Sequence, residues 1–73
     1  MTPKDFCNHH GFRLVPKEQD NGRYLINVTD ERCTLYPSGT RVGTVPIHPA
    51  ILEPWLQKCY NELMDFILDK QYN

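Results

Sequence analysis

The stretch PWLQKCYNELMDFILDKQ, residues 54–71, decides the fold, because it carries the largest apolar surface that the sequence can form. Apolar side chains recur along it at the spacing of one face of an α-helix. This stripe consists of Trp55, Leu56, Cys59, Leu63, Phe66 and Ile67. Since fully burying a side chain such as Leu63 contributes about 1.5–3 kcal/mol, we expect a long C-terminal helix that covers one face of a sheet.

Strand patterns separated by turns fill the middle of the chain. The clearest strand is RYLINV, residues 23–28, because its apolar side chains alternate onto one face. Asn21-Gly22 precedes it and predicts a tight hairpin turn, because this pair accepts positive φ angles. We expect further strands over 12–15, 33–36 and 41–45, the last with a bulge at Gly43.

A short helix is expected near the N-terminus. Thr2 can cap it and Pro3 suits its first position. Gly11 is a natural residue just past its end, because it adopts positive φ without a steric penalty. These signals predict a helix over about residues 3–10.

Two prolines set the start of the long helix. A helix running from Pro49 through Pro54 would lose a hydrogen bond and clash in its second turn. We therefore expect a turn over 49–52 and a helix from Pro54 to about Gln71. Helices at both ends of a run of strands indicate one small α+β domain, residues 1–73. Its expected architecture is a short N-terminal helix, a three- to four-stranded antiparallel sheet and a long C-terminal helix packed on one face.

Composition and charge narrow the classes of partner. The 73 residues include 8 basic and 9 acidic side chains, so the net charge of −1 gives no excess that attracts nucleic acid or anionic lipid. A domain this small buries only about 60% of its unfolded surface, so we expect a partner or self-association. No apolar run approaches the roughly 20 residues that span a bilayer, and we expect a cytoplasmic protein without membrane contact. The odd set of widely spaced cysteines predicts free thiols in the core: Cys7, Cys33 and Cys59.

No pattern of catalytic or metal-binding residues is specific. Ser38 lies in a turn where its hydroxyl has a local bonding role. Cys7-Asn8-His9-His10 lacks a close Cys-x-x-Cys pair, and we interpret its histidines as favourable charges at a helix C-terminus. We assign no catalytic residue, no metal and no cofactor. The alternative is His48 as a general base, although no carboxylate is close to it in sequence.

The last helix offers a candidate contact surface. Apolar side chains there widen the apolar arc beyond what one sheet face needs, and acidic side chains lie beside them. Such a strip is typical either of a protein contact or of a solvated face with scattered apolar residues. The candidate partner-binding residues are Tyr60, Met64, Asp65, Leu68 and Asp69.

Two stretches resemble a known family. One is the helix end His10-Gly11-Phe12, and the other runs from Tyr36 to Pro49, YPSGTRVGTVPIHP. Together they are similar to the HicA-type toxins of bacterial toxin–antitoxin pairs. The resemblance implies a double-stranded-RNA-binding-domain-like αβββα fold and RNA cleavage. This chain lacks the family's active histidine, which follows a glycine-serine pair at a strand start.

Two functional hypotheses follow. The first is a small non-enzymatic protein-binding module, a regulator or inhibitor that docks on a protein partner or a second copy through the long helix and an open sheet edge. The alternative is an RNA-binding or RNA-cleaving protein like HicA, in an active or inactivated form.

Overall fold

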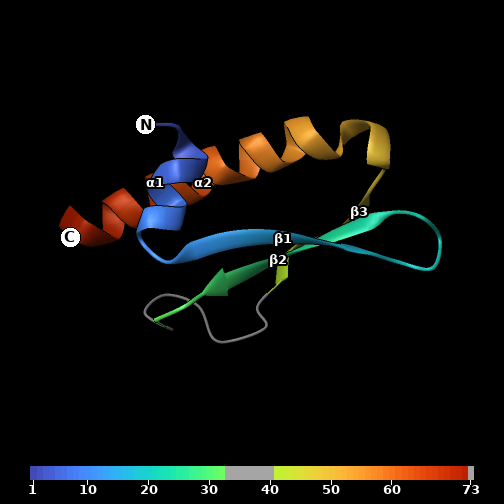
Figure 1. The fold of residues 1–73 in the computed structure, drawn as a ribbon, viewed down its shortest axis with the longest axis horizontal. Coiled ribbons are helices and arrows are strands. Elements are labelled where there is room, and N and C mark those ends of the chain that lie inside the picture. The colour runs from blue at the N-terminus through green and yellow to red at the C-terminus, as the bar shows by residue number, and fades with distance from the viewer. Residues whose placement is uncertain (33–40, 73) are drawn as a thin grey trace.

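A long C-terminal helix lies over an antiparallel sheet, and a short N-terminal helix packs beside it (Figure 1). The structure, a computed structural model, describes the backbone of residues 1–32 and 41–72 and the side chains of residues 1–32 and 46–70. The expected α+β class is confirmed. The expected strand over 33–36 lies outside the described residues. The elements are α1 (Pro3–His9), β1 (Phe12–Glu18), β2 (Tyr24–Asp30), β3 (Arg41–Ile47), the 3-10 turn η1 (Pro49–Ile51) and α2 (Leu52–Tyr72).

The sheet has the order β1-β2-β3, and both pairings are antiparallel. In β1 and β2, side chains alternate between a buried face toward the helices and an outer face. The register of β2 on β3 shifts between Tyr24 and Ile26, opposite the segment from Val42 to Ile47. This irregularity lies in the part of β3 that contains Gly43, where the sequence predicts a bulge.

The hairpin between β1 and β2 closes over a three-residue loop. Gln19 N–H donates to Arg23 O at 2.8 Å, and Gly22 N–H donates to Gln19 O at 2.9 Å. Gly22 has φ of 77°, the left-handed conformation that ends such a loop. Asn21 Oδ1 accepts from Arg23 N–H at 3.0 Å. Asn-Gly therefore forms the predicted turn, with the amide side chain bonding to the backbone.

The ends of α1 follow the predicted capping. Thr2 Oγ1 accepts from Asp5 N–H at 3.1 Å, and Gly11 follows the C-cap His10 with φ of 88°. Gly11 O then accepts from Glu31 N–H at 2.9 Å. This bond joins the end of α1 to the residue that follows β2.

α2 begins two residues earlier than expected. His48 Nδ1 accepts from Ala50 N–H at 3.0 Å and so starts the turn η1, which occupies most of the expected turn over 49–52. Helix α2 then starts at Leu52, with Pro54 as its third residue. The N–H groups of the first four helical residues have no intrahelical acceptor, so proline there costs no backbone hydrogen bond.

The core lies between the sheet and the two helices. From α2 it takes Cys59, Tyr60, Leu63 and Ile67; from the rest of the chain it takes Cys7, Phe12, Leu14, Ile26, Val28 and Ile47. Trp55 and Phe66, which the helical stripe places in the core, are 37% and 38% exposed. Tyr60, expected at the edge of the stripe, is 6% exposed. The buried face of α2 is therefore rotated from the expected one, because α1 packs against α2 and Tyr60 finds a polar partner inside.

Candidate functional site

A groove lies between the start of α1, strand β1 and the first half of α2. Its volume is about 530 Å³, within the range typical of ligand pockets. Apolar groups contribute most of its lining, from Leu14 and Pro16 on β1 and from Leu56 and Tyr60 on α2. The polar side chains around them are Thr2, Lys4, Glu53, Gln57 and Asn61. An apolar floor inside a polar rim is the general arrangement of a protein contact surface.

Tyr60 gives the floor of the groove its shape. Its hydroxyl accepts a hydrogen bond from Leu14 N–H at 3.0 Å and lies 3.5 Å from Leu14 O. The backbone of Tyr60 is fixed from the other side, because Cys7 Sγ donates to Tyr60 O at 3.6 Å. Tyr60 is thus held from β1 through its hydroxyl and from α1 through its backbone carbonyl.

The same hydrogen bonds show which way the edge of β1 faces. Gln19 N–H points to β2, where it meets Arg23 O. Backbone N–H and C=O groups alternate in direction along an antiparallel strand. The backbone groups of Leu14 and Pro16 therefore point away from β2 and toward the groove. Tyr60 occupies the N–H of Leu14, and Pro16 has none. The middle of this edge is therefore closed to a further strand.

The five candidate partner-binding residues do not form one exposed patch. Tyr60 belongs to the core and the groove floor. Met64 is half-buried and packs against the core, and Leu68 is half-buried. Asp65 and Asp69 are exposed. Of the five, Tyr60 alone lines the groove.

Among residues 52–70 of α2, whose side chains the structure describes, two large apolar side chains are exposed, Trp55 and Phe66, and the sequence pattern assigns both to the core. Lys58 Nζ lies 5.1 Å from the centre of the Trp55 ring, and Lys70 Nζ lies 5.6 Å from the centre of the Phe66 ring. Both distances fit cation–π contacts. A lysine one turn after each aromatic residue is the signal in the sequence that could have placed these rings at the surface.

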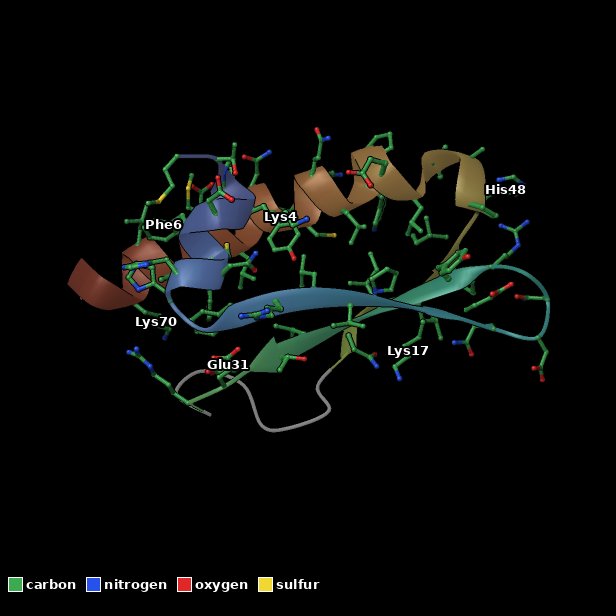
Figure 2. All side chains as sticks on the ribbon, viewed as in Figure 1. Lys4, Phe6, Lys17, Glu31, His48 and Lys70 are labelled. Carbon is green, nitrogen blue, oxygen red and sulfur yellow. The ribbon has the colours of Figure 1, made fainter. Side chains whose placement is uncertain are left out.

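The histidines have structural surroundings. His48 is exposed, and its Nδ1 accepts the hydrogen bond that caps η1. It lies at the far end of the molecule from α1 (Figure 2). His10 packs its ring 4.5 Å from that of Phe6 and 5.6 Å from that of His9. Within the part of the chain that the structure describes, no three His, Cys, Asp or Glu side chains are grouped so that they could hold a metal ion.

Two of the three cysteines lie in the core. Cys7 is fully buried, and burial raises the pKa of its thiol to about 11. The pKa of the Cys59 thiol is also raised, mainly by burial and further by the nearby Glu62 carboxylate. Neither thiol is poised as a nucleophile, because the reactive thiolate is disfavoured. Cys33 and Ser38 lie outside the described residues.

No protein-family model, curated protein or solved structure matches this chain.

Across residues 1–32 and 41–72, none of the helices combines the length and the hydrophobicity that crossing a membrane requires.

Proposed function

We propose that this chain is a small protein-binding module without catalytic chemistry, which docks by receiving apolar side chains of a protein partner in the groove. One observation carries the proposal: an apolar floor of Leu14, Pro16, Leu56 and Tyr60 is surrounded by polar side chains and open to solvent. Binding energy in protein contacts concentrates in such pockets, where a large side chain is desolvated.

The closed edge of β1 indicates how the partner binds. A partner segment cannot add as a strand beside Leu14 and Pro16, because the one N–H available there is bonded to Tyr60. Recognition then depends on side chains that enter the groove rather than on backbone pairing. Lys4 and Glu53 carry opposite charges on its rim, so they favour a segment with an acidic and a basic residue beside its apolar anchor.

The environment of His48 supports a non-catalytic role. A general base needs a ring nitrogen that can accept a proton from a substrate. His48 Nδ1 already accepts from Ala50 N–H, and the ring stands outside the groove. His48 acts instead as the cap of η1, which leads directly into α2.

The test is affinity purification of the tagged full chain from cells that naturally encode it, with wild type compared against Asn61→Arg and Lys4→Glu. Both rim residues are exposed, so these substitutions should leave the fold intact. Lys17→Glu is the matched control, because Lys17 is exposed on β1 outside the groove (Figure 2). We expect wild type and Lys17→Glu to retain one protein in stoichiometric amount and both groove variants to lose it. Retention by all four chains would contradict docking in the groove.

RNA is the alternative ligand. The described order of helix, three strands and helix agrees with the layout that the HicA resemblance implies. RNA that elutes with the chain, binds less tightly as salt is raised and is cleaved by wild type but not by His48→Ala would support this alternative and remove the protein-binding proposal.

A further inference from the structure

An exposed stripe runs along α2 on the flank away from the groove. It consists of Trp55, Glu62 and Phe66, spaced seven and four residues apart, and the buried Cys59 lies beneath it. This is the spacing with which two helices pack side by side over several turns. With a rise of 1.5 Å per residue, its two aromatic ends lie about 16 Å apart. At 3.6 residues per turn, the groove residues Gln57 and Asn61 fall on roughly the opposite side of the helix.

We propose that this stripe is the contact surface for a second copy of the chain, with the two α2 helices antiparallel about a two-fold axis near residues 60 and 61. In that arrangement Trp55 packs against Phe66 of the second copy, and by symmetry Phe66 packs against its Trp55. The exposed Glu62 side chains of the two copies lie between the two aromatic layers, close to the axis. One chain thus supplies both halves of a self-complementary surface.

The charges beside the stripe select a second copy in this orientation. Lys58 and Asp65 are exposed and lie seven residues apart, on the solvent side of the stripe. Among the described residues, neither takes part in a salt bridge. In an antiparallel pair Lys58 falls beside Glu62 and Asp65 of the second copy, and the contact occurs twice. In a parallel pair the two Glu62 carboxylates would instead face each other at the same level, where like charges repel, and each Lys58 would face the other flank of the second copy, away from its Glu62 and Asp65.

Two further observations favour a second copy of the chain as the partner of this stripe. Lys58 is already held over the Trp55 ring, so its ammonium lies at the edge of the stripe and less side-chain entropy is lost on pairing. The net charge of −1 leaves little general repulsion between copies. A contact made by one helix from each copy lies at the small end of interface sizes. The dimer is therefore weak and depends on protein concentration.

The test is sedimentation velocity of the full chain over a concentration series, under reducing conditions. Wild type should change from monomer to dimer as its concentration rises. Lys58→Glu leaves three acidic side chains at positions 58, 62 and 65, and Glu62→Lys with Asp65→Lys leaves three basic ones at the same positions. Each variant alone should dimerise at least about tenfold more weakly, because its copies repel. An equimolar mixture of the acidic and basic variants should form a heterodimer at least as stable as the wild-type dimer.

Matched controls separate this contact from the groove. Glu53→Lys and Lys17→Glu change the same charges away from the stripe and should keep the wild-type dimer. Asn61→Arg, which blocks the groove, should keep it too. A wild type that stays monomeric at every concentration, a dimer indifferent to Lys58→Glu, or a mixture that fails to associate would overturn the proposal without affecting docking in the groove.

Discussion

The hydroxyl of Tyr60 accepts a hydrogen bond from the backbone N–H of Leu14 at 3.0 Å. This bond connects the middle of the longest helix to the middle of an edge strand 46 residues away in sequence. Both residues are buried, so the bond is shielded from water. It determines which face of α2 points inward and closes the edge of β1.

Tyr60→Phe should lower the free energy of unfolding by about 1–3 kcal/mol, because it leaves a buried N–H of Leu14 without its partner. Urea denaturation followed by far-UV circular dichroism measures the change. Tyr24→Phe is the matched control, because Tyr24 is half-buried and its hydroxyl bonds to no described residue. A loss no larger for Tyr60→Phe than for Tyr24→Phe would show that the bond does not stabilise the fold.

The thiol of Cys7 should make stability fall at high pH. Burial raises its pKa from 9.0 to about 11 in the folded state, so between these values the unfolded chain has lost the proton and the folded chain retains it. The stabilisation is complete below pH 9 and decreases by up to about 1.4 kcal/mol per pH unit above it. Unfolding of wild type and Cys7→Ala at pH 8, 9 and 10 measures the slope. Equal slopes in the two proteins would rule out this contribution.

The conformation of Gly22 predicts a specific cost of substitution. A Cβ at this position would meet no atom within 4 Å, so the penalty comes from φ of 77° alone. Gly22→Ala should destabilise the protein by about 1 kcal/mol, and Gly22→Asn by less, because asparagine tolerates this region better. Thermal unfolding of the two variants distinguishes them. Equal stability of Gly22→Ala and wild type would mean that the turn adopts another conformation.

His48 should behave as a cap and not as a base. His48→Ala removes the acceptor for Ala50 N–H and should cost about 0.5–2 kcal/mol. His48→Asn should recover most of that loss, because an amide oxygen can accept the same bond. Chemical denaturation provides the comparison. If the asparagine variant were as unstable as the alanine variant, the cap would not explain why a histidine stands here.

The sequence predicts the elements of this fold better than the orientation of its last helix. Caps, turns and alternation are local, so Thr2, Gly11 and Asn21-Gly22 locate α1 and the hairpin with little error. The start of α2 is misplaced by two residues, because proline ends a helix in the interior but is tolerated in the first turn.

The candidate site was harder to predict for a different reason. The apolar arc of α2 is wide, and ranking side chains by size places Trp55 and Phe66 inside and Tyr60 at the edge. In the structure Tyr60 is inside because Leu14 offers a buried partner for its hydroxyl. That partner lies on another element, so no periodicity within α2 could indicate it. The groove forms between three elements and has no signature within any one of them.

The closed edge of β1 also bears on how the chain can aggregate. A fibre that grows by adding strands needs every molecule to offer two sides on which a neighbour can stack. In this chain Pro16 and the Tyr60 hydroxyl block one of these two sides, the free edge of β1. Growth through the sheet would therefore end after a single addition, which limits this route to closed pairs and prevents open-ended polymers.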